Sequence, residues 1–267
     1  MINNADYQYN SLLKEILETG YKDQNRTGIS TYKLFGKTFR FDLQKEFPII
    51  TTKFVAFKTA IKEIMWIYVQ GNNNVKDLQN MNVKIWDEWM KEDGTIGPAY
   101  GYQARHWGGN IDQVKNLIDT LKNDPYSRRM IVSFWNVQDL PEMALQPCCF
   151  LTMWDVVGDM LNMSLIIRSN DLILGNPFNM CQYAALQCMV AHVTGFKPGI
   201  FSMYMNNVHV YENHIEGAKL QLSREPYEST AKIWINPEVK NFDDFKPNDI
   251  RLLDYKCHDK IKFDVAV

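Results

Sequence analysis

The segment from residue 178 to residue 194 constrains the fold most, because it has the length and spacing of a helix but very little polar surface. Its apolar side chains recur at helical spacing, as at Leu186, Met189 and Val193, and Gly195 supplies a helix stop. A helix that is apolar nearly all round is stable only when other elements bury it. We therefore expect this helix at the centre of the molecule.

The rest of the chain supplies elements of both kinds to surround it. Helical spacing predicts helices over residues 7–19, 57–70, 111–121 and 211–222. Alternating or continuous apolar runs predict strands over residues 30–43, 130–135, 150–156, 161–167, 200–205, 232–235 and 260–265. No linker, repeat or low-complexity tract divides the sequence. We expect one α+β domain over residues 1–267, with a mixed sheet packed against helices.

Composition excludes several classes of protein. The net charge of −2 excludes a constitutively basic nucleic-acid binder, although a local basic patch is still compatible with it. No apolar run approaches the ~18 residues of a membrane span. Residues 1–6 have neither the basic nor the apolar part of a secretion signal. We expect a cytoplasmic protein that does not contact membranes.

The cysteines and histidines predict neither disulfides nor a metal site. The five cysteines are an odd number and include no CxxC pair. The five histidines form no HExxH or HxH motif. A different signal comes from residues 86–109, which hold three Trp and five Gly without a clean period. Long irregular segments in compact domains are usually functional.

Cys148 is the first candidate for chemistry. Pro147 precedes it and a predicted strand follows, which is a corner that can project a side chain into a cleft. The alternative is a small core residue, the usual role of a cysteine outside disulfides. A cysteine nucleophile reacts as its thiolate, and an unperturbed thiol with a pKa of about 8.5 is mostly protonated near pH 7. A catalytic Cys148 therefore requires nearby positive charge.

Four arginines could supply that charge. Arg26 lies in a loop, Arg128 and Arg129 follow a proline turn, and Arg168 ends the apolar run 165–167. Most arginines are solvated, but one that ends an apolar run is expected to be buried and to need an anion. Guanidinium groups that converge bind a phosphate dianion in a forked geometry. Since the sequence has no GxxxxGK[ST] or GxGxxG motif, these residues by themselves indicate a cysteine enzyme acting on a small phosphorylated substrate.

Ten segments in order resemble the thymidylate synthase family along nearly the whole chain. They are residues 25–28 (NRTG), 62–66 (KEIMW), 85–89 (IWDEW), 97–101 (GPAYG), 124–129 (DPYSRR), 146–148 (QPC), 168–171 (RSND), 174–179 (LGNPFN), 209–211 (HVY) and 265–267 (VAV). The resemblance implies reductive methylation of dUMP to dTMP, with 5,10-methylenetetrahydrofolate as the carbon and hydride donor. It also implies a homodimer that uses the sheet as its interface, and no metal.

The resemblance also assigns roles to residues. Cys148 matches the nucleophile that adds to uracil C6, and the other catalytic matches are Glu63, Tyr100 and Asp171. The matches to dUMP ligands are Arg26, Arg168, Ser169, Asn170, Asp171, Asn179, His209 and Tyr211, with Arg128 and Arg129 donated by the other subunit. The matches on the folate side are Trp86, Trp89, Asp171, Gly175, Phe178 and Ala266, with Val267.

Two of these residues have plainer alternatives. The Asn179 amide can donate to uracil O4 and accept from N3–H, a pattern that cytosine reverses, and cytosine-specific relatives carry Asp there. An Asn that opens an apolar helix can equally be its N-cap. Glu63 lies between apolar helical residues, where a lone Glu usually faces solvent.

The sequence departs from the family pattern at three places. Cys149 stands where His is common, and Asn206–Asn207 replace a common Gly-Asp before the HVY segment. Ala56 stands where many relatives have a His that contacts folate, so we expect no such side-chain contact here. Strand alternation predicts that Cys149 points away from the ligand.

Two other functions compete with thymidylate synthesis. A dUMP hydroxymethylase shares the fold, the nucleophile and the folate, but adds water where the synthase adds hydride. An RNA-binding regulator without catalysis is the alternative from another class. The acidic pI and the absence of an RNP-like aromatic strand oppose RNA binding.

Overall fold

The computed structural model describes residues 4–25, 27–228 and 231–265. Its main element is a six-stranded mixed sheet in the order β1-β2-β6-β5-β4-β3. The strands are β1 (Tyr21–Asp23), β2 (Thr31–Asp42), β3 (Ile131–Ser133), β4 (Cys149–Val157), β5 (Met160–Asp171) and β6 (Lys197–Tyr211). Only β5 and β6 pair in parallel among the described strands. The carboxyl ends of both therefore reach the same edge, which positions the candidate site.

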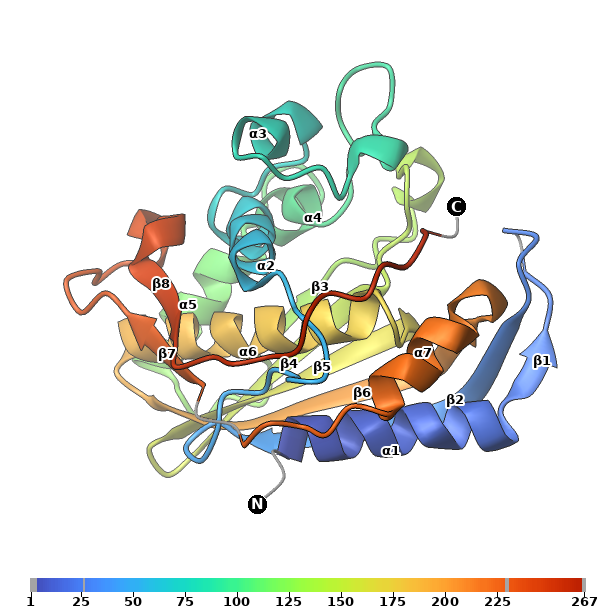
Figure 1. Cartoon of the computed structure of the whole chain (residues 1–267). Helices are drawn as coiled ribbons and strands as arrows, with labels where there is room; N and C mark the ends of the chain where they lie inside the picture. The colour runs from blue at the N-terminus through green and yellow to red at the C-terminus, as the bar shows by residue number, and fades with distance from the viewer. Residues whose placement is uncertain (1–3, 26, 229–230, 266–267) are drawn as a thin grey trace.

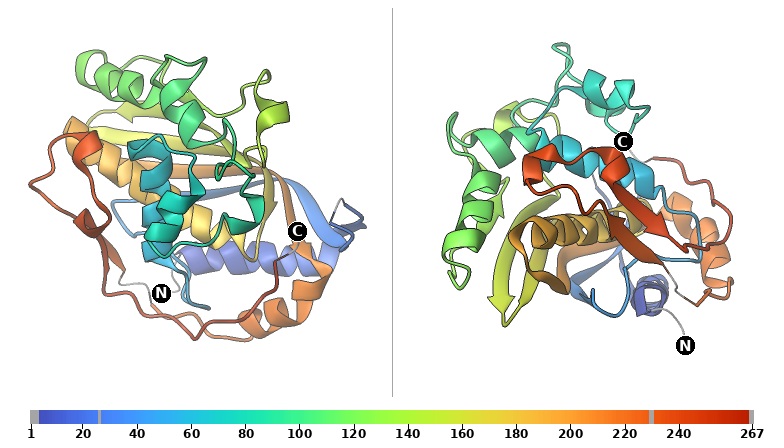
Figure 2. Two further views of the ribbon diagram at one scale, coloured as in Figure 1. Left: turned by 90° about the horizontal axis from the view of Figure 1, so that it is seen from above. Right: turned by 90° about the vertical axis from the view of Figure 1, so that its left-hand side faces the viewer.

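The predicted apolar helix is confirmed as the central element. It is α6 (Gly175–Thr194), whose residues 180–191 are buried without a break, and it ends at Gly195 in the left-handed region with φ +81°. Figures 1 and 2 show α6 lying between the sheet and α2 (Phe57–Ile64). The buried Gln187 amide donates to the carbonyls of Leu161 and Ile200, at 2.8 and 3.2 Å, which ties α6 to β5 and β6.

The remaining helices pack around this centre. They are α1 (Asn4–Thr19), α3 (Val75–Asn80), α4 (Gly101–His106), α5 (Gln113–Asn123) and α7 (Ile215–Leu222). The predicted helix over 57–70 is α2 followed by a π-helical turn, η1 (Met65–Val69). Short 3-10 turns are η2 (Asp87–Trp89), η3 (Leu140–Glu142), η4 (Glu212–His214), η5 (Phe242–Asp244) and η6 (Pro247–Asp249). No helix in the described part of the chain has the length and apolar character to cross a membrane.

One face of the sheet carries exposed apolar side chains. On β4, Trp154 and Val156 are buried, whereas the alternate residues Met153 and Val157 are 39% and 63% exposed. Ile131 on β3 is 47% exposed. Because successive strand residues point to opposite faces, the buried set faces the helices and the exposed set faces away from them.

The strand predicted over 260–265 is wrong. The second sheet pairs β7 (Lys232–Ile235) with β8 (Ile250–Leu253), while residues 260–265 form an irregular extended segment. Its alternating pattern has another cause: Phe263 packs on α7, where a Cβ on Gly217 would lie 2.4 Å from the Phe263 ring. The carbonyl of Asp264 is 2.6 Å from Nε2 of His214. Alternate burial against a helix produced the same period as a strand.

Candidate active site

A cavity of about 820 Å³ opens at the carboxyl ends of β5 and β6. Elements distant in sequence form its wall: the β1–β2 hairpin, α2, residues 84–89, the start of α6 and Val265. Most of the site residues predicted from sequence meet in this wall: Glu63, Trp86, Trp89, Tyr100, Cys148, Arg168, Ser169, Asp171, Gly175, Phe178, Asn179, His209 and Tyr211. Its size is that of a pocket for small organic ligands.

Cys148 lies immediately before β4, at the cavity wall. Its main-chain N–H donates to the Tyr100 hydroxyl at 3.1 Å, and Nη2 of Arg168 is 3.8 Å from its Sγ. The Arg168 guanidinium is held there by the carbonyls of Gln146 and Pro147, at 2.7 and 2.9 Å. The positive charge that a thiolate requires is therefore next to the sulfur.

Cys149 is placed differently from its neighbour. It is 4% exposed, and burial raises its pKa well above the ordinary value. That Cys149 points away from the ligand stays a prediction, and Cys149 is among the residues of the cavity wall. The ladder between β4 and β5 has an irregularity between Cys149 and Leu151, which interrupts simple alternation.

Glu63 is buried in the wall and does not face solvent. The Trp86 indole N–H donates to Oε1 and the Gln182 amide donates to Oε2, both at 2.6 Å. Burial raises the pKa of Glu63 above its ordinary value, against the opposing effect of these two hydrogen bonds. A carboxyl group with a raised pKa takes up and holds a proton more readily than an ordinary one, which suits it to exchange a proton with a ligand.

Tyr100 has a strained backbone at φ +42°, immediately before α4. Aromatic packing fixes its ring, whose centroid is 5.2 Å from that of Trp86 and 5.7 Å from that of Phe134. Trp86 in turn packs edge-on against Trp89 at 5.7 Å. The irregular segment 86–109 is thus the source of the aromatic side of the cavity.

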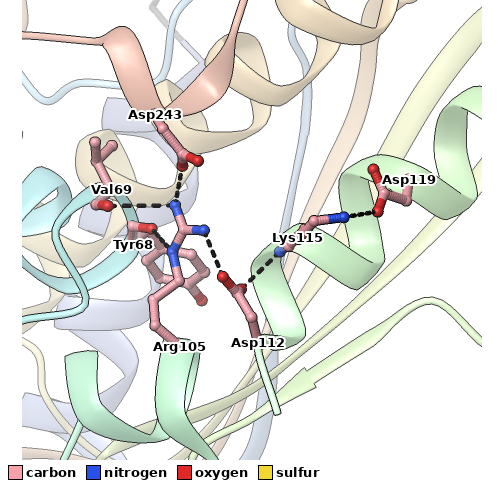
Figure 3. Close-up of polar contacts among 7 residues, drawn as sticks. All are labelled: Tyr68, Val69, Arg105, Asp112, Lys115, Asp119 and Asp243. Atoms are coloured by element: carbon pink, nitrogen blue, oxygen red, sulfur yellow. Dashed lines mark hydrogen bonds and ion pairs between the residues drawn. The ribbon is translucent and has the colours of Figure 1, made fainter. Parts of the chain in front are cut away.

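Sequence reasoning missed Arg105, which anchors α4 to the elements around it (Figure 3). Its Nε donates to the carbonyl of Tyr68 at 2.7 Å, and Nη2 donates to that of Val69 at 3.2 Å, at the end of the π-helical turn. Nη1 donates to Asp112 at 2.9 Å, and Nη2 also contacts Asp243. A lone arginine in a short helix carries no sequence signal of this role.

His209 and Asp171 are paired across β5 and β6 in the sheet register. Oδ1 of Asp171 accepts from the N–H groups of Ile173 and Leu174, at 2.8 and 3.2 Å, in the turn that leads to α6. Nδ1 of His209 is 2.9 Å from Oδ1 of Asn207. Burial lowers the pKa of His209, so the imidazole is neutral near pH 7. The departure at Asn206–Asn207 thus supplies a hydrogen-bond partner for His209.

Asn179 is the fifth residue of α6, and Leu174 occupies the N-cap. The N-cap alternative for Asn179 is therefore excluded. Its Oδ1 accepts from Asn170 at 3.4 Å, and the buried Asn170 accepts from Asn176 at 2.7 Å. This chain of amides holds the Asn179 side chain at the cavity wall.

Comparison with known proteins identifies the family. The family model described as thymidylate synthase matches residues 7–267. Thymidylate synthase from Clostridium beijerinckii is 54% identical over 98% of each chain. Thymidylate synthase 1 from Bacillus subtilis is 46% identical over 98% of this chain and 99% of its own. The chain belongs to the thymidylate synthase family.

A solved structure gives the same result for the fold. The thermostable thymidylate synthase A from Bacillus subtilis superposes with a TM-score of 0.92 at 46% identity, covering 98% of this chain and 99% of that one. The α+β fold with a mixed sheet, expected from the pattern of predicted helices and strands, is therefore confirmed.

Some predicted residues are not in the cavity wall. Asn170, predicted as a dUMP ligand, is buried and is not among the residues that line the cavity. Arg128 and Arg129 are exposed on the segment between α5 and β3, outside the cavity as the described residues define it. Arg26 and the C-terminal Ala266 and Val267 lie outside the described residues. Ala56 immediately precedes α2.

The wall also contains charged residues that sequence reasoning did not select. Asp23 is the last residue of β1, and Lys33 is the third residue of β2. They line the cavity and form an ion pair with each other. Neither belongs to a segment that suggested the thymidylate synthase family. The only available signal was their position on either side of the loop that carries Arg26.

Proposed function

We propose that this chain converts dUMP to dTMP, with 5,10-methylenetetrahydrofolate as the donor of the one-carbon unit and of the hydride. The observation that carries the proposal is the position of Cys148, which lies between Arg168 and Tyr100 in a cavity that also presents Asn179 and His209. A nucleophile, its counter-charge, a proton-transfer group and an amide for base recognition share one wall.

The nucleotide binds through groups suited to each of its parts. Arg168, Ser169 and Arg26 bind the phosphate. The neutral His209 and Tyr211 bind the deoxyribose 3′-hydroxyl. Asn179 donates to uracil O4 and accepts from N3–H, and Asn170 fixes the orientation of that amide.

Cys148 activates the base. Its thiolate adds to C6, so an S–C6 bond forms and the C5–C6 π electrons move to C5 and O4. C5 then forms its bond to the methylene carbon while the bond from that carbon to N10 of the folate breaks. Loss of the C5 proton breaks the bond from the same carbon to N5 and leaves an exocyclic C5=CH2 group on the nucleotide. Hydride from the folate reduces this group to methyl, the C5–C6 double bond re-forms and expels the sulfur, and the folate leaves as dihydrofolate. Covalent addition is needed because C5 of uracil is a poor nucleophile until C6 is saturated.

Glu63 and Tyr100 serve the proton transfers that accompany these reaction steps. The raised pKa of Glu63 lets it protonate and deprotonate the O4 side of the ring, and Trp86 and Gln182 hold the carboxyl in place. Tyr100 assists removal of the C5 proton. Because burial raises its pKa well above the ordinary value, the phenol is protonated and acts as a hydrogen-bonding group.

The other side of the cavity fits a pterin. Trp86, Trp89 and Phe178 provide flat apolar walls, Asp171 provides a carboxylate, and Gly175 leaves room at the start of α6. Ala266 belongs to the same subsite in this proposal. These residues would orient the folate ring above the base.

The catalytic unit is a homodimer formed through the sheet. The exposed apolar residues on the face directed away from the helices, among them Met153, Val157 and Ile131, support this assembly. Each subunit donates Arg128 and Arg129 to the phosphate in the other subunit. We place the enzyme in the cytoplasm, where its small-molecule substrates are dissolved.

Identification of both products tests the proposal. With dUMP and methylenetetrahydrofolate, the chain should form dTMP and dihydrofolate in equal amounts, and Cys148→Ala should form neither. Hydroxymethyl-dUMP together with tetrahydrofolate would show the hydroxymethylase. The thymidylate synthase names of the relatives favour methylation.

A further inference from the structure

Two lysines on β2 form comparable ion pairs, but only one of them faces the cavity. Lys33 pairs with Asp23 of β1, with side-chain exposures of 34% and 41%. Lys37 pairs with Glu15 of α1, with exposures of 30% and 43%. Lys33 and Asp23 both line the cavity, and neither Lys37 nor Glu15 belongs to its described wall. The two pairs are thus alike in chemistry and exposure and differ in their position.

The neighbours of Lys33 belong to the nucleotide side of the cavity. Lys33 lies opposite His209 in the antiparallel register of β2 and β6. Arg168, Ser169 and Asn207 share the cavity wall with it. Lys33 also lowers the pKa of Asp23 by their hydrogen bond, and it contributes, after burial, to the lowered pKa of His209. The charge of Lys33 therefore acts on Asp23 and His209, which both line the cavity.

The Lys33–Asp23 pair is open to exchange. A partly exposed ion pair holds its partners only weakly, because water solvates both ends. A phosphate monoester carries a charge of about −1.5 to −2 at pH 7 and offers three acceptor oxygens, so it attracts an ammonium more strongly than one carboxylate does. The other lysine in the described wall is Lys84, close to Trp86 on the folate side.

We propose that Lys33 is a further ligand for the phosphate of the nucleotide substrate, and that Asp23 is the counter-ion that holds its ammonium until the substrate binds. The inference rests on the proposed function, since it takes dUMP as the substrate. On binding, the Lys33 ammonium moves from the Asp23 carboxylate to the phosphate. The pair then acts as a preformed but replaceable contact beside the loop that carries Arg26.

The simpler role for this pair is to close the β1–β2 hairpin. The two roles predict opposite results for the two ends of the same ion pair. If the pair only closes the hairpin, Lys33→Met and Asp23→Asn both disorder the loop and both weaken dUMP binding. If Lys33 binds phosphate, Lys33→Met weakens binding, whereas Asp23→Asn removes a competitor and leaves binding at least as tight as before.

The experiment measures the Kd of dUMP by titration calorimetry on the full-length protein. We expect Lys33→Met to raise the Kd about fivefold, the upper range for a partly exposed charge contact. Asp23→Asn should bind dUMP as tightly as wild type or more tightly. Deoxyuridine, which lacks the phosphate, should have the same dissociation constant for wild type and Lys33→Met, as determined by competition with dUMP. Lys37→Met is the matched control and should leave every value unchanged.

Three results would overturn the inference. The first is an unchanged Kd for dUMP in Lys33→Met, and the second is a higher Kd for dUMP in Asp23→Asn. The third is an equal loss of affinity for dUMP and for deoxyuridine in Lys33→Met. Failure of the proposed function would look different, because wild type itself would then make no dTMP. Wild-type turnover is therefore measured on the same preparations.

Discussion

The hydroxyl oxygen of Tyr100 lies 3.1 Å from the main-chain nitrogen of Cys148 and accepts its hydrogen bond. This contact joins a residue with φ +42° to Cys148, which lies immediately before β4 and 48 positions later in the sequence. The tyrosine is thus fixed relative to the sulfur by the backbone of Cys148. Arg105 fixes the helix on which Tyr100 depends.

Tyr100→Phe tests the role of that hydroxyl. The ring contacts with Trp86 and Phe134 are kept, while the acceptor for the Cys148 N–H and the proton-transfer group are lost. We expect kcat to fall about 100-fold, the scale of general acid–base assistance, with little change in the KM for dUMP. Tyr102→Phe, two residues later on α4, should retain wild-type kcat. A kcat in Tyr100→Phe within about twofold of wild type would exclude this role.

Cys148 and Cys149 should differ sharply in reactivity. Iodoacetamide should alkylate Cys148, which has Arg168 beside it, and dUMP should protect it. Cys149 should stay unmodified because burial raises its pKa. Cys148→Ala should abolish turnover, whereas Cys149→Ala should retain most of it. Peptide mapping with activity assays checks both, and equal losses in the two variants would contradict the assignment.

Glu63→Gln should change how stability depends on pH. Burial raises the pKa of Glu63 above 4.5, so the folded state holds this proton more tightly than the unfolded state. The stabilisation is fully present below about pH 4.5 and is lost as the pH rises through the folded-state pKa. Glutamine cannot lose that proton.

The free energy of unfolding of Glu63→Gln should therefore fall less than that of wild type between about pH 5 and about pH 8. Urea denaturation at the two pH values measures this difference. Glu18→Gln, at an exposed ion pair on α1, should follow wild type. Parallel pH profiles for wild type and Glu63→Gln would show that the Glu63 pKa is not raised.

Asn179→Asp tests base recognition. Opposite uracil O4 a carboxylate sets acceptor against acceptor, and an unpaired buried polar group costs about 1–3 kcal/mol. The ratio of kcat/KM for dCMP over dUMP should rise at least about tenfold, mostly through lost dUMP activity. Because Leu174 and not Asn179 occupies the N-cap of α6, capping offers no other explanation. A variant that processes dUMP normally and ignores dCMP would contradict the role.

Subunit mixing tests the donation of Arg128 across the dimer. An Arg128→Ala subunit has an intact Cys148, and a Cys148→Ala partner supplies an intact Arg128, so each hybrid dimer has one complete site. Random exchange makes half of the dimers hybrids and should restore about a quarter of wild-type activity. If the exchanged mixture stays as inactive as its parents, Arg128 acts within its own subunit or not at all.

The sequence was most informative where local pattern and chemistry coincide. The apolar run over α6 predicted the central helix, and the corner at Pro147 predicted a cysteine with an arginine beside it. The apolar run before Arg168 predicted a buried guanidinium, which is wrong, because Arg168 is half-buried at the cavity wall. The resemblance to the thymidylate synthase family then supplied roles that spacing alone could not.

What could not be predicted depends on contacts between distant segments. Arg105 and Lys33 look like ordinary surface cations until the fold brings Asp243 to the first and places the second in the cavity wall. Residues 260–265 showed a strand period, but Phe263 of this segment packs against α7, and no local pattern distinguishes such packing from pairing in a sheet.

The central claim is that Cys148 adds to C6 of dUMP while the folate is bound. A fluorine at C5 cannot leave as a cation, so 5-fluoro-dUMP should stop the reaction before the sulfur is released. Intact-mass spectrometry of the protein with 5-fluoro-dUMP and methylenetetrahydrofolate should show one adduct equal to the sum of both, mapped to Cys148 and absent from Cys148→Ala. An unmodified protein, or an adduct on Cys149, would contradict the account.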